Sequence, residues 1–466
     1  MKFDFGLVGL GVMGRNFILN VAEKGYSSIG LSSSMDSINI LKNDGADYNI
    51  EGTTSDKKFI ESLTTPRKIM LLVPAGEPVD SMIERLLPYL KENDLIVDGG
   101  NSHFDDTERR YNYLKKKNIN FLGAGVSGGS RGARNGPSIM PGGSKESYAL
   151  ISKIFEDVSA KVGKDPCVEY LGGSSSGHYV KMIHNGIEYA IMQLISEVYN
   201  VLKIGLNKNN KELSEIFTDW NNKILDSYLL EITGDIFNVK DDETGNYLVD
   251  QILDKAKQKG TGKWTSQSAM DLGVSIPTID SSVSMRIISS FKELRQKASD
   301  IYASDIQNNM NIDEDQVEKS LIFSFIISFA QGLSQLQIAS KEKSYNLNLE
   351  SICRIWRGGC IIRAKLLENF MAAFKKNPKL ENLLFDPEIA QLIKDTESAA
   401  REVSIFCINS NIPAYGLLSS LSYFDSLKSS KLPTNLVQAQ RDCFGEHTFE
   451  RIDKSGFFHH NKWQSK

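Results

Sequence analysis

A glycine-rich turn close to the first residue is the feature that most constrains how this chain can fold. Gly9, Gly11 and Gly14 complete a GxGxxG motif, which follows a short apolar segment at residues 3–8 and precedes helical spacing that continues to Ala22. Glycines at these positions allow a tight turn and let a pyrophosphate approach the free N–H groups of the helix. Because strand, turn and helix follow in the required order, the segment predicts the first βαβ unit of a dinucleotide-binding domain.

Short apolar runs continue this pattern through the first third of the chain. They occur at residues 28–31, 68–73, 95–97 and 119–122, with stretches of helical spacing between them. Alternating strands and helices of this kind form a mostly parallel sheet covered by helices. We therefore predict an α/β Rossmann-type coenzyme domain over residues 1–175.

The pattern of apolar residues changes at about Ser176. Long amphipathic segments at residues 179–204, 213–232 and 317–341 replace the compact strand runs. Apolar residues spaced three and four apart are typical of helices that share a core. The sequence therefore predicts a large all-α domain at residues 176–433.

The chain ends in a tail at residues 434–466, which follows Pro433. This segment is rich in Gln, Arg, His and aromatic residues, a composition that suits docking on another surface better than forming a core of its own. The total of 466 residues is long enough for about three folded parts at roughly 150 residues per domain. We predict a C-terminal tail as the last of these parts.

The overall composition limits the classes of partner. The chain has 41% hydrophobic and 24% charged residues with a formal net charge of −4, which is typical of a soluble globular protein and provides no general attraction for nucleic acid. The longest nearly apolar run, Leu321–Ala330, is shorter than the roughly 20 residues that span a bilayer, and the first residues lack a signal-peptide pattern. We expect a cytoplasmic protein without nucleic-acid or membrane partners.

The spacing of cysteine and histidine gives no sign of a metal site or a disulfide framework. The five cysteines are odd in number and scattered, without a CxxC pair. His459 and His460 are adjacent, but other residues with metal-ligand spacing do not accompany them. We expect buried free thiols and no required metal.

A cluster of polar residues at helical spacing marks a candidate site. Lys181, His184, Asn185 and Glu188 follow i, i+3, i+4, i+7 spacing, so an amine, an imidazole, an amide and a carboxyl share one helix face. Apolar neighbours flank the cluster and favour a buried site. A solvated helix face with a Lys and a Glu two turns apart explains the same spacing. The pattern alone leaves both interpretations open.

Two glycine-containing segments are further candidates for ligand binding. Ser127-Gly128-Gly129 within residues 125–143 offers flexible backbone that could wrap a ligand, or that forms a surface loop. Residues 259–264 read KGTGKW, which resembles a phosphate loop but lacks the Walker spacing. Hydrolysis of a nucleoside triphosphate is therefore disfavoured.

The end of the second predicted strand normally distinguishes NAD from NADP. An acidic residue there binds the ribose 2′-hydroxyl of NAD, whereas a nearby Arg accepts the 2′-phosphate of NADP. This chain has Ser32-Ser33-Ser34 followed by Asp36, so neither signature is present. Three hydroxyls can donate to a phosphate, but without charge they hold it less well than a guanidinium does.

Longer motifs occur in order along nearly the whole chain. They are Gly9–Gly14, Asp98–Asn101, Gly125–Gly129, Met140–Gly143, Val180–Tyr189, Lys259–Trp264, Trp356–Arg363 and Gln438–Asp442. In this order the motifs resemble the decarboxylating 6-phosphogluconate dehydrogenases of the pentose phosphate pathway and of gluconate utilisation. The resemblance implies a Rossmann domain, a helical domain that forms most of a homodimer interface, and a tail that reaches the active site of the partner subunit.

The resemblance also implies the reaction. Members of the family oxidise 6-phosphogluconate at C3 with NADP, release CO2 from the 3-keto acid, and protonate the enediol to give ribulose 5-phosphate, without a metal. Lys181 matches the general base of the family, and Glu188 matches the acid that protonates C1 of the enediol. About 10 Å of helix rise separates the two residues, so they would act at different carbons.

By the same resemblance, the site residues fall into three groups. Those that match contacts to the sugar acid are Asn101, Ser127, Gly128, Gly129, His184 and Asn185. Those that match the phosphate pocket are Tyr189, Lys259, Thr261, Arg286 and Arg441, with His447 beside Arg441 on the tail. Those that match coenzyme contacts are Gly9, Leu10, Gly11, Val12, Met13, Gly14, Ser32, Ser33, Ser34, Val73, Pro74, Ala75 and Asn101.

Some positions depart from the family pattern. The family commonly has Asn-Arg-Thr where this chain has Ser32-Ser33-Ser34, a Lys where Pro74 stands, and two Glu where Ser130-Arg131 stand. We therefore expect a weak preference for NADP, or use of NAD as well. Two alternatives remain: a β-hydroxyacid dehydrogenase that acts on a smaller acid, and a non-catalytic relative that binds a nucleotide or a sugar phosphate.

Overall fold

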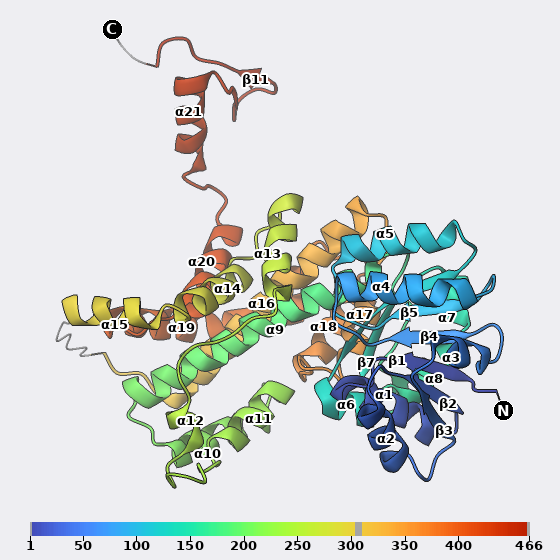
Figure 1. The fold of residues 1–466 in the computed structure, drawn as a ribbon. Coiled ribbons are helices and arrows are strands. Elements are labelled where there is room, and N and C mark those ends of the chain that lie inside the picture. Colours follow the sequence, from blue (N-terminus) through green and yellow to red (C-terminus); the bar gives the residue numbers. More distant parts are fainter. Residues whose placement is uncertain (1, 303–309, 464–466) are drawn as a thin grey trace. The chain divides into compact units, whose positions relative to one another are not determined.

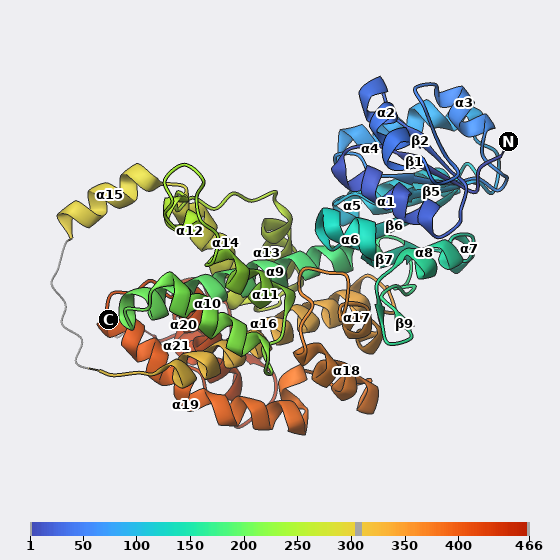
Figure 2. The same ribbon diagram turned by 90° about the horizontal axis from the view of Figure 1, so that it is seen from below.

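The computed structural model describes residues 2–302 and 310–463. The chain forms two compact units, Met1–Ser420 and Leu421–Lys466. The first unit contains a sheet with its covering helices, followed by a helical part (Figure 1, Figure 2). The predicted change from sheet to helices near residue 176 is confirmed, because a long helix begins at Ser176.

A seven-stranded sheet organises the first part of the chain. Its order is β3-β2-β1-β4-β5-β6-β7, and neighbouring strands are parallel except for the antiparallel pair β6 and β7. The strands are β1 (Phe5–Val8), β2 (Ser28–Leu31), β3 (Ile50–Thr53), β4 (Lys68–Leu71), β5 (Leu95–Asp98), β6 (Asn120–Ser127) and β7 (Ser138–Gly143). The strand order reverses beside β1, and sheets of this type bind ligands at the carboxyl ends of the strands there.

Helices cover both faces of this sheet. Helices α1, α2 and α8 contribute to one apolar core, and α3, α4 and α5 contribute to the other. The helical segments of this part are α1 (Val12–Glu23), α2 (Met35–Asp44), α3 (Asp56–Glu61), α4 (Glu77–Leu86), η1 (Leu87–Tyr89), α5 (Phe104–Lys115), α6 (Gly129–Asn135), α7 (Lys145–Ala149) and α8 (Ser152–Val158). A two-stranded sheet of β8 (Lys161–Val162) and β9 (Asp165–Pro166) follows.

The helical part surrounds two long helices, α9 and α16, which pack against each other, and α19 packs along α16. Its elements are α9 (Ser176–Asn200), η2 (Val201–Gly205), α10 (Asn210–Asn221), α11 (Tyr228–Ile236), α12 (Leu248–Gln251), α13 (Thr261–Leu272), α14 (Pro277–Ser289), α15 (Lys292–Ile301), α16 (Glu314–Glu342), α17 (Leu349–Ile355), α18 (Leu366–Lys376), η3 (Leu383–Phe385), α19 (Pro387–Asn409) and the first residues of α20 (Tyr415–Lys428), which continues into the second unit after Ser420. The prediction of a large helical region after the sheet is confirmed.

The sequence patterns did not predict two strands of the sheet, β3 and β7. The predicted strands correspond to β1, β2, β4, β5 and β6, but β3 is a short edge strand with partly exposed side chains, and β7 contains a Pro and two Gly. The prediction of flexible backbone at residues 125–143 is wrong. This segment forms β6, α6 and β7, and β7 is fully buried.

The helical prediction for residues 213–232 is wrong in one respect. Helix α10 ends at Asn221 and α11 begins at Tyr228, because the Ser227 hydroxyl accepts the N–H of Leu230 and starts a new helix. Among the described residues, α16 is the one helix long and apolar enough to cross a membrane by length and composition. Within the fold, 83% of its most apolar window is buried, as in a core helix.

Glycines let α9 lie directly on the sheet. A Cβ on Gly125 of β6 would stand 2.3 Å from the Cβ of Lys181, and a Cβ on Gly177 would stand 2.2 Å from the carbonyl oxygen of Gly123. These distances are far below van der Waals contact, so larger residues would push the helix away. The glycines therefore bring Lys181 close to the carboxyl end of β6.

The second unit, Leu421–Lys466, folds around a buried carboxylate. Asp442 of α21 (Thr434–Gly445) accepts hydrogen bonds from Trp463 Nε1 at 2.7 Å and from two backbone N–H groups, and lies 2.9 Å from His459 Nδ1. The strands β10 (Phe449–Glu450) and β11 (Phe457–Phe458) form a short antiparallel hairpin. Phe444 and Phe457 are 75% and 77% exposed, so polar contacts organise this unit and large apolar side chains remain at its surface.

In the first unit, Glu197 of α9 is a buried carboxyl that receives the start of α20. It accepts the N–H groups of Gly416 and Leu417 at 2.8 and 2.9 Å and is 2% exposed. Burial raises the pKa of Glu197 to about 7 from 4.5, against the effect of these hydrogen bonds. The folded protein therefore holds a proton on Glu197 that the unfolded chain has already released near neutral pH.

We expect the free energy of unfolding to fall by about 3 kcal/mol as the pH rises from 4.5, the ordinary pKa of a Glu carboxyl, to about 7. The reason is that the unfolded chain releases the proton of Glu197 over this range, whereas the folded protein retains it. Glu197→Gln removes the titration, so the stability of the variant relative to the wild type should rise by this amount over the same range. Urea unfolding at several pH values measures the difference, with the exposed Glu215→Gln as a matched control. A difference that does not change with pH would contradict the assignment.

Candidate active site

The polar face of α9 is buried, and its side chains contact one another. Lys181 Nζ donates to Asn185 Oδ1 at 2.8 Å and lies 3.2 Å from His184 Nδ1. His184 Nε2 lies 3.1 Å from Ser127 Oγ at the end of β6. Lys181, His184 and Asn185 are 6%, 0% and 7% exposed. A solvated helix face is therefore excluded for these three residues. The side chain of Glu188, one turn further along α9, is 21% exposed, and its carboxyl lies 3.8 Å from His184 Nδ1.

Burial shifts the proton affinities of this cluster. Burial lowers the pKa of Lys181, although the charge of Glu188 opposes the shift. Burial, together with the charge of Lys181, holds the pKa of His184 well below its usual range. Burial raises the pKa of Glu188, against the charges of Lys181 and Arg286. The amine can therefore act as a base and the carboxyl as an acid nearer to neutral pH than exposed groups would.

A segment after α17 completes this wall of the site. The N–H of Ile361 donates to Ser127 Oγ at 3.4 Å, and Gly128 leaves room for a carbonyl of the same segment, which a Cβ would approach to 2.5 Å. Trp356 is fully buried and packs edge-on against the ring of His184, with 5.7 Å between ring centres. The sequence patterns did not single out Trp356 and Ile361 as site residues. In the sequence, these two residues are part of the longer motif Trp356–Arg363.

A second group of predicted residues meets around the ring of Tyr189. The guanidinium carbon of Arg286 lies 3.5 Å from the centre of this ring. Gly262 packs against the same ring, which a Cβ would approach to 2.5 Å, and it follows the buried Thr261 at the start of α13. Burial lowers the pKa of Arg286. A cation partly removed from water beside a helix start is suited to hold a phosphate.

Other predicted substrate residues are exposed. Lys259 lies in the loop before α13 and Asn101 in the loop after β5. The ring of His103, at the end of the second loop, contacts the ring of Trp264 on α13 edge-on, with 5.0 Å between ring centres. Gly129 is exposed at the start of α6. Arg441 and His447 belong to the second unit and are exposed there.

The glycine motif has the backbone that a dinucleotide requires. Gly9 has a φ of +96°, and a Cβ there would lie 2.5 Å from the carbonyl oxygen of Leu72, while a Cβ on Gly14 would lie 1.8 Å from that of Gly9. Gly11 faces open space and caps α1 without a side-chain hydrogen bond. The first N–H groups of α1 are thus available to an anion, and the residues present fit a pyrophosphate.

The other predicted coenzyme residues differ in how far their side chains are exposed. The side chain of Leu10 is buried in the core, 3% exposed, so only its backbone is available, whereas Val12 is 60% exposed. Met13 is partly buried at the start of α1. Residues 73–75 belong to the loop between β4 and α4, where Pro74 and Ala75 are exposed.

Comparisons with known proteins decide the family. Residues 4–172 match the model of the NAD binding domain of 6-phosphogluconate dehydrogenase, and residues 177–463 match the model of the 6-phosphogluconate dehydrogenase C-terminal domain. The chain belongs to the 6-phosphogluconate dehydrogenase family. The family predicted from the motifs is therefore confirmed over nearly the whole chain.

Full-length relatives agree with this assignment. The NADP(+)-dependent, decarboxylating 6-phosphogluconate dehydrogenase of Bacillus subtilis is 47% identical over 462 residues, which cover 98% of each chain. The decarboxylating enzyme of Escherichia coli is 47% identical over 463 residues, again 98% of each chain. The solved structure of Plasmodium falciparum 6-phosphogluconate dehydrogenase, determined in its apo form, with NADP+ and with 6-phosphogluconate, has a TM-score of 0.96 and 44% identity and covers 98% of this chain and 100% of that chain.

In this member of the 6-phosphogluconate dehydrogenase family, the segment after β2 carries hydroxyls. Ser32 Oγ accepts the N–H of Ser34 at 3.1 Å, and Ser34 caps α2 by accepting the N–H of Ser37 at 3.3 Å. Ser33 is exposed. Each serine can still donate its hydroxyl proton to a phosphate, but without a positive charge.

The five cysteines of this family member are free thiols. Within residues 2–302 and 310–463, no group of three or more His, Cys, Asp or Glu could hold a metal ion. Cys167, Cys353, Cys360 and Cys407 are buried, but Cys443 is exposed. The expectation of buried thiols is therefore wrong for Cys443, which lies in the polar second unit.

Proposed function

We propose that the protein oxidises 6-phosphogluconate with NADP and decarboxylates the product to ribulose 5-phosphate. The observation that carries the proposal is the buried contact of Lys181 with His184 and Asn185, with Glu188 on the same helix. Burial provides the base with a lowered pKa and the acid with a raised one, and the reaction needs both. Full-length relatives with this activity support the proposal.

Lys181 acts at C3 of the substrate in both chemical steps. Bound NADP supplies the hydride acceptor. The neutral amine of Lys181 takes the proton of the C3 hydroxyl as the hydride leaves C3. The resulting ammonium then donates to the C3 keto oxygen and stabilises the charge that develops there while the C1–C2 bond breaks and CO2 departs. Because this ammonium supplies the needed positive charge, we propose that no metal is required.

Glu188 completes the reaction at the carbon that has lost CO2. Its raised pKa lets it carry a proton, which it gives to this carbon, C1 of ribulose 5-phosphate, as the enediol becomes the ketone. Asn185 holds Lys181 in place through its amide oxygen. The residues that contact the sugar acid are, in this proposal, Asn101, Ser127, Gly128, Gly129, His184 and Asn185.

The phosphate end of the substrate explains the second cluster. We propose that Tyr189, Thr261, Arg286 and Lys259 hold the phosphate together with Arg441 and His447 of the partner subunit. Cations that converge on a phosphate form strong charge-assisted hydrogen bonds. A smaller hydroxy acid would leave these cations unpaired, which argues against a β-hydroxyacid dehydrogenase.

We propose a cytoplasmic homodimer in which each tail reaches the active site of the other subunit. Ile287, Phe291 and Leu294 on α14, α15 and their connection are 46%, 49% and 65% exposed. Large apolar side chains on successive turns favour contact with a second copy of the chain. The exposed Phe444 and Phe457 of the second unit suit the same interaction.

A coupled assay tests the proposed function. Purified protein is incubated with 6-phosphogluconate and either NADP or NAD, and reduced coenzyme and CO2 are measured together. Equal amounts of both products support oxidative decarboxylation. Absence of turnover, with NADPH binding intact, would favour the second candidate, a non-catalytic relative that binds nucleotide or sugar phosphate; the departures at Pro74 and Ser130-Arg131 motivate that candidate.

We expect the wild type to prefer NADP weakly or to use both coenzymes, because Ser33 donates without charge. A charged hydrogen bond is worth about 1.5–3 kcal/mol, so its absence lowers affinity for the 2′-phosphate roughly ten- to a hundredfold. Ser33→Arg should therefore raise kcat/KM for NADP much more than for NAD. Steady-state kinetics with both coenzymes measures the effect, with Asn39→Arg on the exposed face of α2 as a control for added charge. A wild type already strongly selective for NADP and indifferent to Ser33→Arg would show that other groups hold the phosphate.

A further inference from the structure

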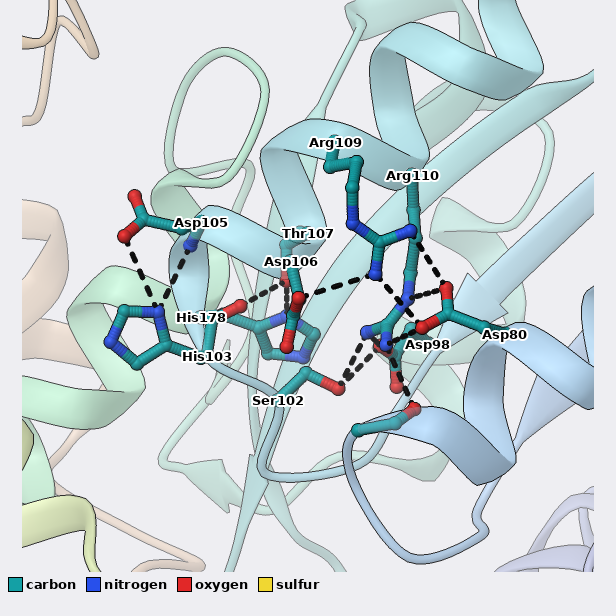
Figure 3. A network of polar contacts seen from close by, with 11 residues as sticks. Asp80, Asp98, Ser102, His103, Asp105, Asp106, Thr107, Arg109, Arg110 and His178 are labelled. Atoms are coloured by element: carbon teal, nitrogen blue, oxygen red, sulfur yellow. Dashed lines mark hydrogen bonds and ion pairs between the residues drawn. The ribbon is translucent and has the colours of Figure 1, made fainter.

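Two loops at the carboxyl edge of the sheet meet at a buried guanidinium. The loop after β4, residues 72–76, carries proposed coenzyme contacts, and the loop after β5, residues 99–103, carries Asn101. Arg110 of α5 lies between the two loops and is 1% exposed (Figure 3). A fully buried Arg is rare unless its donors are paired, so its partners reveal its role.

Every N–H group of Arg110 has an acceptor. Nε donates to Asp80 Oδ1 at 2.8 Å, and Nη2 donates to Asp80 Oδ2 at 3.0 Å and to the carbonyl oxygen of Gly76 at 2.9 Å. Nη1 donates to Asp98 Oδ2 at 3.3 Å and to Ser102 Oγ at 3.2 Å. One rigid, planar group therefore binds the start of α4, the end of β5 and the loop that follows β5.

Asp98 holds both neighbours of Asn101. Its Oδ1 accepts the N–H of Gly100 at 3.1 Å, its Oδ2 accepts the hydroxyl of Ser102 at 2.6 Å, and the residue is fully buried. Asn101 itself is exposed between them. The position of its amide therefore depends on Asp98, and through Asp98 on Arg110.

Helix α5 also contacts the helix that carries Lys181. Thr107 Oγ1, one turn before Arg110, lies 2.6 Å from Nδ1 of His178. His178 is buried and lies one turn before Lys181 on α9. The helix that holds both loops thus also contacts the helix with the proposed general base.

We propose that Arg110 is a positioning residue that keeps the coenzyme loop and the Asn101 loop at a fixed separation. The inference rests on the proposed function of these loops. Displaced loops would bind both ligands more weakly, which raises both KM values. Hydride transfer also requires the two bound molecules in close alignment, so kcat/KM falls as well. A single guanidinium bonded to both loops limits such displacements. Arg110 touches neither ligand and acts through Gly76, Asp98 and Ser102.

The neighbouring Arg109 provides a matched control. It forms hydrogen bonds to Asp80, as Arg110 does, and to Asp106, but its side chain is 55% exposed. Arg110→Lys retains a positive charge beside Asp80 and Asp98 while losing the planar set of donors. Arg109→Lys makes the same chemical change without altering the hydrogen bonds to Gly76, Asp98 and Ser102.

We expect Arg110→Lys to raise KM for 6-phosphogluconate and for NADP together and to lower kcat/KM about ten- to a hundredfold, whereas Arg109→Lys changes each constant less than about twofold. Loss of folded protein alone would lower kcat and leave both KM values unchanged, so the KM values separate positioning from stability. Ser102→Ala serves if Arg110→Lys fails to fold. It removes one hydrogen bond to Asp98 and should raise KM for 6-phosphogluconate by a smaller factor.

A double-mutant cycle with Asn101→Ala gives the sharpest test. If Arg110 acts through Asn101, Arg110→Lys should raise KM for 6-phosphogluconate much less in the Asn101→Ala background than in the wild type. Equal effects in both backgrounds, or unchanged KM values in Arg110→Lys, would overturn the inference. A wild type without turnover would instead overturn the proposed function. In that case the inference is tested by the dissociation constant of NADPH, measured by fluorescence. Arg110→Lys should raise this constant and Arg109→Lys should leave it unchanged; any other result would overturn the inference.

Discussion

Lys181→Ala should lower kcat for 6-phosphogluconate by about 10⁴-fold. This value is the upper end of the roughly 10²–10⁴-fold that general-base catalysis contributes, because in the proposed mechanism the same amine also stabilises the keto oxygen during loss of CO2. A single substitution therefore affects both steps. Steady-state formation of reduced coenzyme, measured at saturating concentrations of both substrates, gives the factor.

Two controls separate chemistry from packing at this position. Lys181 is 6% exposed, so Lys181→Ala leaves a cavity beside His184 and Asn185. Lys181→Met fills most of this volume without an amine and should be as inactive as Lys181→Ala. Both variants should bind NADPH with nearly the affinity of the wild type. If either one retained near-normal turnover, Lys181 would not be the general base.

The sequence predicts those strands that carry their own apolar signal. Ser28–Leu31 has the same bounds in the sequence prediction and in the structure, because four buried residues stand between two turn signals. Strand β7 has no such signal, since Pro141, Gly142 and Gly143 rarely occur together in a strand. Its pairing with β6 and its burial below α9 make this segment a strand, and these are contacts between distant parts of the chain.

The same distinction holds for the site. Helical spacing places Lys181, His184 and Asn185 on one face, but their burial depends on Gly125 and Gly177, which bring α9 onto the sheet. Local patterns do not contain that contact. The proposed phosphate residues are predicted only by the resemblance to a family, because their spacing in the sequence has no period.

Arg110 shows the limit of local patterns most clearly. Its partners Asp80 and Asp98 lie 30 and 12 residues away in the sequence, and an Arg on a polar helix looks like an ordinary surface residue. A buried ion-pair network becomes visible only when the sheet has placed its strand ends side by side. Residues that position a site from behind are therefore the hardest to predict.

A mixture of two inactive variants should regain activity if the tail acts in the partner's site. In the proposed homodimer, Lys181→Ala removes the proposed base, and Arg441→Ala removes a proposed phosphate contact, whose loss should raise KM for 6-phosphogluconate roughly ten- to a hundredfold. In a heterodimer, one site combines the intact Lys181 of one chain with the intact Arg441 of the other. The second site of the same heterodimer lacks both groups.

Random exchange of equal amounts of the two variants should restore about a quarter of the wild-type activity, because half of the dimers are then mixed and each mixed dimer has one complete site of two. The assay is run at a 6-phosphogluconate concentration well below the KM of the Arg441→Ala variant, after unfolding and refolding the chains together, and mixed dimers are verified with two affinity tags. Each variant refolded alone provides the baseline. If each tail instead completed the site of its own chain, every site in the mixed dimer would be incomplete. The chain that retains Lys181 lacks Arg441, and the chain that retains Arg441 lacks Lys181. Mixed dimers without any gain above the baseline would therefore rule out an active site shared between subunits.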